Sequence, residues 1–335
     1  HLRELPLNKI YIKFNRSFSE KIFSLARNEF GNWRLLGKYL NIKRGDTTIG
    51  ISWRKGRTCY PLYSMVALAN KLNISIIELE NNIEEIKYKS IESKGKGNGG
   101  KAIIKPKLPI KIDENFAELI GHLCGDGTIS RSSPNKGIGF GYINSEPALI
   151  GNFIILMKEI FGQIEPNIII REGKNYTRPN YYLQYPSIIS AFILSVFDFK
   201  PGDDKDIPSF ILNMNQEAKS RFLMGIFDDE SYVRSNRKRS IEIGLKPRIQ
   251  IVKIKKLLES IGIKTGRINK YKYNSTHRIL IANQESLKKF QSIINFKHPD
   301  KREKLNKAIN ESWKFKRNSN YKCKEKILNI LINTI

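Results

Sequence analysis

The stretch Phe116-Ala-Glu-Leu-Ile-Gly-His-Leu-Cys-Gly-Asp-Gly-Thr-Ile129 decides the fold of this chain, because its pattern returns at Arg221-Phe-Leu-Met-Gly-Ile-Phe-Asp-Asp-Glu-Ser-Tyr-Val233. Each copy is an apolar helical segment with a glycine five residues before an acid, and a β-prone residue follows the acid. A pattern that recurs in this detail predicts that one structural unit is present twice.

The residues that follow the two stretches also correspond. Pro147 and Pro247 each begin an amphipathic helix, and strand pairs rich in basic and aromatic residues follow at 168–184 and 264–281. An apolar helix then closes each copy. The order helix, hairpin, helix, hairpin, helix is therefore expected twice. We predict the α+β class, with a pseudo-twofold duplicated αββαββα domain and two four-stranded sheets.

The repeated glycines predict how the two first helices meet. Gly121 and Gly225 lie inside expected helices, where glycine costs about 1 kcal/mol relative to alanine, and close helix packing would offset that cost. If the helices pack side by side about a pseudo-twofold axis, Asp126 and Glu230 come close together at their C-terminal ends. Two adjacent carboxylates repel unless a cation lies between them. The alternative is that both are ordinary helix-end acids.

Composition favours a polyanionic partner. The 335 residues include 59 Lys and Arg against 32 Asp and Glu, a net charge of +27, while 40% are hydrophobic and suffice for two or three cores. Basic side chains that neutralise phosphates release counterions, which supplies much of the affinity for nucleic acid. The alternative is a merely basic, soluble protein. Three cysteines and four scattered histidines form no zinc or disulfide pattern.

No apolar run is long enough to span a membrane, so no membrane association is expected. No secretory signal is visible, and a cytoplasmic, nucleoid-associated location follows as an expectation.

The segments 119–127 and 223–231 resemble the two copies of the LAGLIDADG motif of homing endonucleases. The resemblance extends over about two thirds of the chain and includes 205–211, before the second motif, and the helix at 255–263. It implies a single chain that acts as a monomer with internal pseudo-twofold symmetry. The two sheets would form a saddle over the major groove of double-stranded DNA, and cleavage across the minor groove would leave staggered ends.

The same resemblance assigns roles to individual residues. Asp126 and Glu230 would be catalytic and would hold Mg²⁺, for which Ca²⁺ or Mn²⁺ would substitute. Such ions prefer oxygen ligands and polarise a phosphodiester. Lys205 and Lys301, each in a polar turn after the closing helix of its repeat, would stabilise the scissile phosphates or position solvent.

Four residues depart from the motif: His122 replaces an apolar residue, Cys124 an acid, Asp229 a small residue and Ser231 a glycine. A charge such as Asp229 at a helix interface is costly. It would either share the metal role or mark a domain that binds DNA without cutting it. Choosing Glu230 over Asp229 as the ligand keeps Gly225 in register with Gly121.

Basic and polar residues of the hairpins form the candidate DNA-reading surface. Arginine, asparagine and glutamine reach base edges, with Gln184 and Asn269 as candidate base readers, while lysine mainly positions phosphates. The alternative for each residue alone is a solvated charge. The set is Arg171, Lys174, Arg178 and Gln184 in the first repeat, and Arg234, Arg237, Lys238, Arg239, Arg267, Asn269, Lys270, Lys272 and Arg278 in the second.

Residues 1–92 are predicted to form a small all-α domain of the helix-turn-helix kind. Helices are expected at 18–30, 33–40, 46–55, 62–72 and 76–81. The segment 61–79 resembles the closing helices of phage-repressor-type domains, which implies a recognition helix over 46–55. The candidate DNA contacts in it are Thr47, Thr48, Ser52, Arg54 and Lys55. The alternative is a helical domain that packs or binds protein.

A Gly- and Lys-rich run sets the domain boundaries. Residues 93–107 are predicted as a flexible linker, which would leave the orientation of the N-terminal domain unfixed. The two repeats are then 108–208 and 209–312, and 313–335 form a helical tail.

These observations favour a site-specific, Mg²⁺-dependent DNA endonuclease of the homing type. One alternative is a non-cleaving transcription regulator that reuses the fold. Another is an intron maturase that binds structured RNA. An intein is not expected, because the chain has neither a nucleophile at its first residue nor a terminal His-Asn pair.

Overall fold

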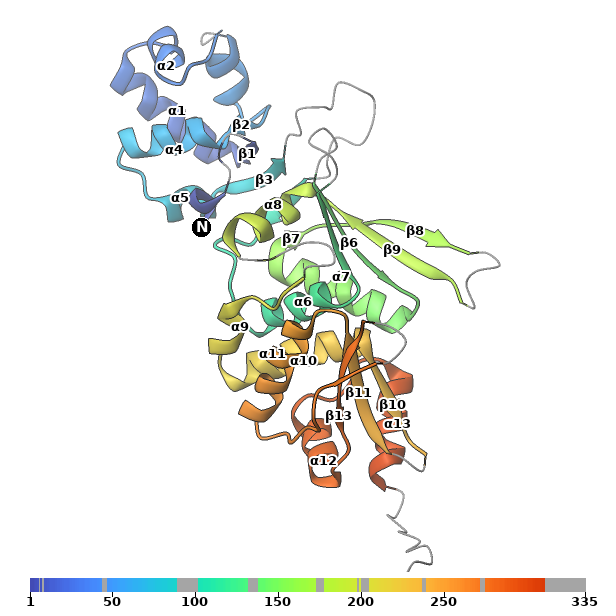
Figure 1. The fold of residues 1–335 in the computed structure, drawn as a ribbon. Helices are drawn as coiled ribbons and strands as arrows, with labels where there is room; N and C mark the ends of the chain where they lie inside the picture. Colours follow the sequence, from blue (N-terminus) through green and yellow to red (C-terminus); the bar gives the residue numbers. More distant parts are fainter. Residues whose placement is uncertain are drawn as a thin grey trace, which may run out of the picture.

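The structure is a computed structural model that describes residues 1–310 except 6, 8, 44–46, 89–101, 132–137, 173–177, 198, 200–204, 237–238 and 272–274. Along the chain, Figure 1 shows an N-terminal unit, a first repeat and a second repeat. The predicted C-terminal tail at 313–335 and most of the predicted linker lie outside the described residues.

The first repeat has the predicted order of elements. They are α6 (Glu114–Cys124), β5 (Gly127–Arg131), β6 (Ile138–Asn144), α7 (Pro147–Phe161), β8 (Asn167–Arg171), β9 (Asn180–Tyr185) and α8 (Ser187–Val196). The strands form an antiparallel sheet in the order β5-β6-β9-β8. In Figure 1, β8 and β9 extend away from the helices as a long hairpin.

The second repeat copies this arrangement. Its elements are α10 (Gln216–Glu230), β10 (Ser231–Arg234), β11 (Ser240–Leu245), α11 (Arg248–Ser260), β12 (Asn269–Lys270), β13 (His277–Ile281) and α12 (Gln284–Ile293). The sheet order is β10-β11-β13-β12, equivalent to that of the first repeat. The predicted α+β class with a duplicated αββαββα domain is confirmed. Between the repeats lies α9 (Ser209–Asn213), and α13 (Pro299–Asn310) follows the second.

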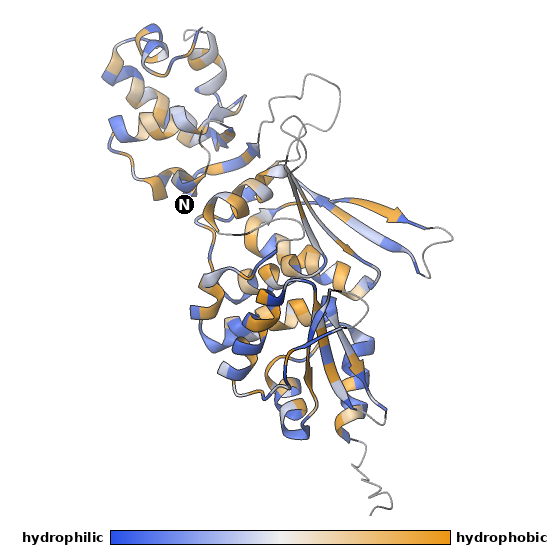
Figure 2. Ribbon diagram, in the orientation of Figure 1, coloured by the Kyte–Doolittle hydropathy of each residue, from blue (hydrophilic) through white to orange (hydrophobic). Residues whose placement is uncertain are grey.

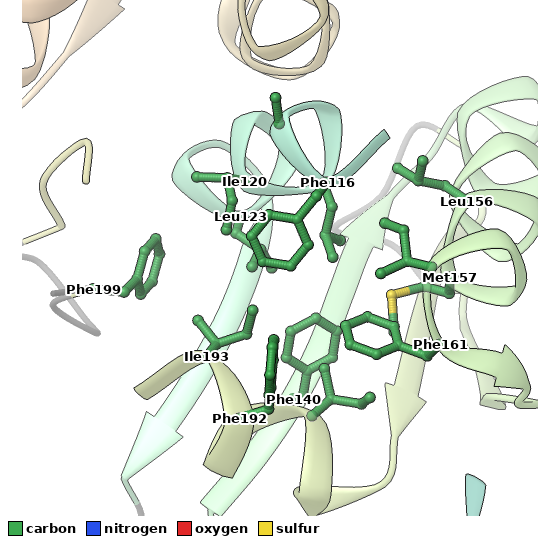
Figure 3. Packing of buried hydrophobic residues seen from close by; sticks show 14 of the residues in the cluster. Phe116, Ile120, Leu123, Phe140, Leu156, Met157, Phe161, Phe192, Ile193 and Phe199 are labelled. Atoms are coloured by element: carbon green, nitrogen blue, oxygen red, sulfur yellow. The ribbon is translucent and has the colours of Figure 1, made fainter. Parts of the chain in front are cut away.

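Each repeat buries one face of its sheet under helices. Figure 3 shows Phe116 and Leu123 of α6 facing Phe140 of β6 and Phe192 of α8, all of them buried. Figure 2 shows α7 and α8 in hydrophobic colours, whereas the helices of the second repeat are more hydrophilic. Figure 1 also shows both four-stranded sheets on the same side of the α6–α10 pair.

Helices α6 and α10 pack backbone against backbone at the two repeated glycines. A Cβ atom on Gly121 would collide with the carbonyl oxygen of Phe222, and one on Gly225 would lie 2.6 Å from the carbonyl oxygen of Glu118. Both helices begin at a side-chain cap, from Asp113 and from Asn215. The predicted side-by-side packing is confirmed, and the C-terminal ends of the two helices meet.

The N-terminal unit has four of the five predicted helices, and a short π-helix replaces the fifth, but the unit is not all-α. Its helices are α1 (Arg16–Phe30), α2 (Trp33–Tyr39), α4 (Leu62–Lys71) and α5 (Ile76–Asn81), together with the short helices η1 (Leu2–Glu4) and η2 (Thr48–Trp53). Strands β1 (Ile10–Phe14), β2 (Tyr60–Pro61) and β3 (Ile83–Tyr88) accompany them. In β1 every second residue is fully buried, which is the period of a half-buried strand. The all-α prediction is therefore wrong.

A single sheet joins this unit to the first repeat. Strand β4 (Ile103–Pro106) pairs with β3 and with β7 (Gly162–Gln163), which gives a five-stranded sheet in the order β2-β1-β3-β4-β7. The predicted linker at 93–107 therefore extended too far, because its last residues pair as a strand. The expected freedom of orientation of the N-terminal unit is also wrong, since hydrogen bonds of one sheet reach across both parts.

Among the described residues, none of the helices has the length and apolar character that a membrane span requires.

Candidate active site and nucleic-acid surface

Two acids meet where α6 and α10 end. Asp126 follows the C-cap Gly125 of α6, and Glu230 is the last residue of α10. Burial raises the pKa of Asp126 to about 8, and the charges of Asp229 and Glu230 raise it as well. Burial and Asp229 also raise the pKa of Glu230. The two predicted acids therefore occupy one site, where their negative charges repel each other.

A lysine from each repeat lies at this site. The Lys205 Nζ donates to the carbonyl oxygens of Gly125 at 2.8 Å and Gly127 at 2.7 Å. The Lys301 Nζ donates to those of Phe227 at 3.1 Å and Asp228 at 2.5 Å. Each lysine thus holds the end of the motif helix of its own repeat. Burial lowers the pKa of Lys301. Lys301 was expected in a polar turn but lies in the first turn of α13, where Pro299 and Asp300 favour a helix start.

The donor atoms at the helix ends suit a hard divalent cation. Mg²⁺ is commonly held by one or two carboxylates together with substrate phosphates and water, rather than by a cage of protein ligands. Asp126 and Glu230 provide two such carboxylates, and their mutual repulsion would be relieved by a cation. In the described part of the chain, no three His, Cys, Asp or Glu side chains form a metal-binding group. The two carboxylates therefore fit a divalent cation whose remaining ligands come from outside the protein.

Asp229 lies beside the acid pair but faces into the protein, and its side chain has no exposed surface. Its Oδ1 accepts a hydrogen bond from the hydroxyl of Tyr142 at 2.7 Å. Its Oδ2 lies 3.0 Å from the His122 Nδ1 and accepts from the backbone N–H of Asp126 at 3.3 Å. Both oxygens are thus engaged by protein groups, which argues against a share in the metal role.

Charges of alternating sign extend from Asp229 through His122 and Glu118 to Lys297 and Arg221. Burial disfavours a charged His122, but Asp229 and Glu118 raise the pKa of His122 to about 10. Burial likewise disfavours a charged Glu118, yet His122 and Lys297 lower its pKa to about 2. Arg221 also pairs with Glu118, at 3.2 Å. The charge of Asp229 at the helix interface is therefore compensated by His122. Replacement of His122 alone would leave the Asp229 carboxylate buried without a cation.

The other departures from the motif have local explanations. Burial raises the pKa of the Cys124 thiol to about 12, so this thiol is protonated at neutral pH. Asp228, at the equivalent position of the second repeat, accepts hydrogen bonds from the backbone N–H groups of Lys297 at 3.1 Å and His298 at 3.0 Å. Ser231 donates to the carbonyl oxygen of Phe227 at 2.5 Å. These side-chain hydrogen bonds of Asp228 and Ser231 go to groups other than Asp126 and Glu230.

Sequence reasoning missed two residues of β6 that reach the site. The Asn144 Nδ2 donates to the Asp126 Oδ2 at 2.8 Å and lies 3.1 Å from the hydroxyl oxygen of Tyr142. Tyr142 pairs with Gly127 in the β5–β6 hairpin. The expected hairpin alone, once its register is drawn, would have placed Tyr142 next to the motif.

The sheets present polar and aromatic side chains on the face opposite the core. Tyr182 and Gln184 alternate with the buried Leu183 and Tyr185 of β9. The guanidinium of Arg171 lies 5.1 Å from the Tyr182 ring centre. Arg178, Arg267, Asn269 and Lys270 are exposed, and Arg239 is half-buried. Four of the predicted DNA contacts, Lys174, Arg237, Lys238 and Lys272, lie outside the described residues.

A carboxylate holds two of the predicted arginines in the second sheet. The Glu242 carboxylate accepts from Arg234 and from Arg278, each at 2.9 Å. Arg278 also lies over the ring of Tyr271, 4.9 Å from its centre. The two arginines are therefore held on the open face of the sheet before any ligand binds.

The predicted recognition helix of the N-terminal unit is shorter than expected. In place of a helix over 46–55 the structure has η2, a π-helix of 6 residues, and it buries Ile49 and Trp53. A Cβ atom on Gly50 would lie 3.0 Å from the Trp33 ring, so this turn packs closely against α2. Of the five predicted contacts, Thr47 and Lys55 are exposed, and Thr48, Ser52 and Arg54 are half-buried.

Comparison with known proteins finds a similarity to one family over part of the chain. Residues 217–295, from α10 to α12, match the family model of the LAGLIDADG-like domain. Among solved structures, that of the homing endonuclease I-DmoI in complex with DNA and Mn is 16% identical, covers 54% of this chain and 96% of that chain, and has a TM-score of 0.39. The N-terminal LAGLIDADG domain of DUF199/WhiA is 17% identical, covers 54% and 82%, and has a TM-score of 0.38.

Three curated relatives carry unrelated names. Glutamine–fructose-6-phosphate aminotransferase of Methanocaldococcus jannaschii is 26% identical over 215 residues, which are 61% of this chain and 18% of that protein. The alpha subunit NrdEB of ribonucleoside-diphosphate reductase of Bacillus subtilis is 24% identical over 219 residues, 57% and 20%. The small subunit of replication factor C of Thermococcus kodakarensis is 26% identical over 217 residues, 63% and 23%. The chain thus spans about a fifth of the length of these relatives.

Proposed function

We propose that this protein is a site-specific endonuclease that cuts double-stranded DNA with a divalent metal ion, as homing endonucleases do. The observation that carries the proposal is that Asp126 and Glu230, at the ends of two backbone-packed helices, are close enough for the charge of Glu230 to raise the pKa of Asp126. A lysine from each repeat lies beside them. A pseudo-twofold pair of acids suits two antiparallel strands related by the same axis.

The chemistry follows from the groups at the helix ends. Mg²⁺ bound there would polarise the phosphodiester and favour a deprotonated water. Asp126 and Glu230 would hold it, and Asn144 would orient the Asp126 carboxylate through its hydrogen bond of 2.8 Å. Lys205 and Lys301 would offset the negative charge of the phosphates at each strand. The net charge of +27 would attract the duplex as a whole.

The curated relatives support a module rather than part of an enzyme of intermediary metabolism. An aminotransferase, a reductase subunit and a replication factor share no named activity, yet each matches this chain over a similar length. Their names therefore give no common activity for the part that resembles this chain. A DNA-cutting element that resides in unrelated host proteins fits this distribution.

A two-stage selection tests the proposal. Randomised duplexes that bind the full chain in Ca²⁺ are enriched, and the enriched pool is then incubated with Mg²⁺, with EDTA as the metal-free control. We expect one duplex family to be cut on both strands only when Mg²⁺ is present, and end sequencing reads the stagger. Tight binding without a nick in Mg²⁺ or Mn²⁺ would instead favour a regulator, and preferential binding of structured RNA would favour a maturase.

Replacement of Arg278 by alanine is expected to weaken binding of the selected duplex and to lower the slope of log affinity against log salt by about 1, if this residue contacts a phosphate. If Arg278 reads a base, the slope stays and discrimination at one base pair is lost instead. Filter binding over a salt series distinguishes the two results. Lys288, exposed on α12 in the helix layer, provides the control variant Lys288→Ala. Equal losses in both variants would contradict a role of this sheet face in binding.

A further inference from the structure

A buried pair of charged residues spans the α6–α10 interface beside the acid site. His122 belongs to α6 and Asp229 to α10, and neither side chain has exposed surface. The His122 Nδ1 lies 3.0 Å from the Asp229 Oδ2 and 3.2 Å from its Oδ1. Two departures from the motif that look independent in the sequence are therefore partners across the pseudo-twofold axis.

The pair is connected to Asp126 by two routes. The backbone N–H of Asp126 donates to the Asp229 Oδ2 at 3.3 Å. The hydroxyl of Tyr142 donates to the Asp229 Oδ1 at 2.7 Å, and the Asn144 Nδ2 lies 3.1 Å from that hydroxyl and donates to the Asp126 Oδ2 at 2.8 Å. Both the main chain and the carboxylate of Asp126 thus depend on where Asp229 lies.

The other end of the network carries compensating charges. The buried carboxylate of Glu118 lies 3.9 Å from the His122 Nε2. Its oxygens also pair with Lys297 at 2.5 Å and with Arg221 at 3.2 Å. The His122 ring is therefore flanked by a carboxylate on each side, and the network continues from the surface of the helix pair to Asp126.

The network exists on one side of the axis only. With Gly121 and Gly225 in equivalent positions, Ile226 stands where His122 stands, and Gly125 stands where Asp229 stands. A Cβ atom on Gly125 would lie 2.7 Å from the Asp229 Cβ, so the glycine leaves the space that Asp229 fills. The three residues His122, Gly125 and Asp229 fit one another, and their contacts reach Asp126.

We propose that His122 and Asp229 form a buried positioning pair that fixes the orientation of Asp126, and that Asp229 positions a metal ligand without being one. This inference rests on the proposed role of Asp126 in metal binding. Residues that orient a ligand from behind commonly change metal affinity or activity by about 10- to 100-fold when they are replaced.

Thermal unfolding of four full-length proteins tests the pairing: wild type, His122→Ile, Asp229→Ala and the double variant. His122→Ile leaves the buried Asp229 carboxylate without its cation, and Asp229→Ala removes the closer of the two carboxylates that flank His122. We expect the apparent Tm to fall by about 6 °C or more in each single variant. The double variant restores the small and apolar pair found on the other side of the axis, and its Tm is expected within about 3 °C of wild type. Additive losses in the double variant would overturn the pairing.

Titration of Ca²⁺ into the protein bound to its selected duplex tests the positioning role. We expect Asp229→Asn and the double variant to bind Ca²⁺ about tenfold or more weakly, even where the double variant is as stable as wild type. Asp228→Asn is the matched control, because its buried carboxylate caps backbone N–H groups and does not contact Asp126. It should lower Tm and leave Ca²⁺ affinity unchanged.

Two results separate this inference from the proposed function. If Asp229→Asn binds Ca²⁺ as tightly as the wild-type protein does, and the wild-type protein cleaves DNA, the positioning role alone is overturned. Absence of Ca²⁺ binding and of cleavage in the wild-type protein would overturn the proposed function, and the positioning role with it. The non-additive effect of the His122 and Asp229 substitutions on Tm needs neither DNA nor metal. The pairing of the two residues can therefore be tested even if the proposed function is wrong.

Discussion

Asp126→Asn is expected to lower the rate of DNA cleavage by about a thousandfold or more, because an amide cannot supply the negative charge that holds a divalent ion. The amide keeps the shape of the side chain, and Asn144 and the backbone N–H of residue 126 remain in place. The affinity for the selected duplex should therefore stay close to that of the wild-type protein. Single-turnover cleavage in Mg²⁺ and duplex binding in Ca²⁺ measure the two quantities separately.

The control for this variant is Glu259→Gln, which removes an exposed carboxylate of α11 that pairs with Lys255 far from the acid site. It changes the net charge by the same amount and should cleave at the wild-type rate. A wild-type rate in Asp126→Asn would exclude Asp126 as a ligand of the catalytic metal. Loss of duplex binding together with cleavage would mean that Asp126 acts in the fold rather than in the chemistry.

Gly225→Ala is expected to lower the free energy of unfolding by about 3 kcal/mol or more, because no side chain can move to make room for the new methyl group. The added Cβ would lie 2.6 Å from the Glu118 carbonyl oxygen and 3.0 Å from the His122 backbone nitrogen. The two helices would have to separate along their shared face, and the acids at their ends would separate with them. Urea unfolding followed by circular dichroism measures the change.

Gly151→Ala provides the matched comparison. Gly151 also lies within a helix, α7, but a Cβ there would meet no atom within 4 Å. Alanine in that position should stabilise the protein by about 0.5–1 kcal/mol, since it loses less backbone freedom on folding than glycine. If both variants shift stability in the same direction, the backbone contact at Gly225 is not what excludes a larger residue there.

The duplicated domain was predictable because its signals are local. A glycine five residues before an acid, a proline at the start of each middle helix and alternating strands can be recognised within short windows. The strands of the N-terminal unit escaped prediction for the opposite reason. β1 is stabilised by pairing with β3, as in Ile12 with Ile86. The residues near Ile12 contain no local signal that identifies a partner so far along the chain.

The candidate site likewise combines residues with a local sequence signal and residues without one. Asp126, Glu230, Lys205 and Lys301 are gathered as the repeat and its resemblance predicted, because each follows a recognisable element. Tyr142 and Asn144 required the register of a hairpin. The ion pair of Glu118 with Lys297 required the packing of the connection between α12 and α13 against α6. His122 and Asp229 each stood out as an anomaly in the sequence. Only the packing of α6 on α10 shows that each anomaly compensates the other.

The sheet shared by the N-terminal unit and the first repeat has a consequence for how this protein is divided. Strand β4 has β3 on one side and β7 on the other. Leu2 and Leu5 line a small apolar cavity together with Phe161 and Phe192 of the first repeat. A truncated protein that begins at β4 would present an open strand edge and uncovered apolar side chains, which are the features that promote aggregation. The N-terminal unit is thus an integral part of the packing of the first repeat and not a separable domain.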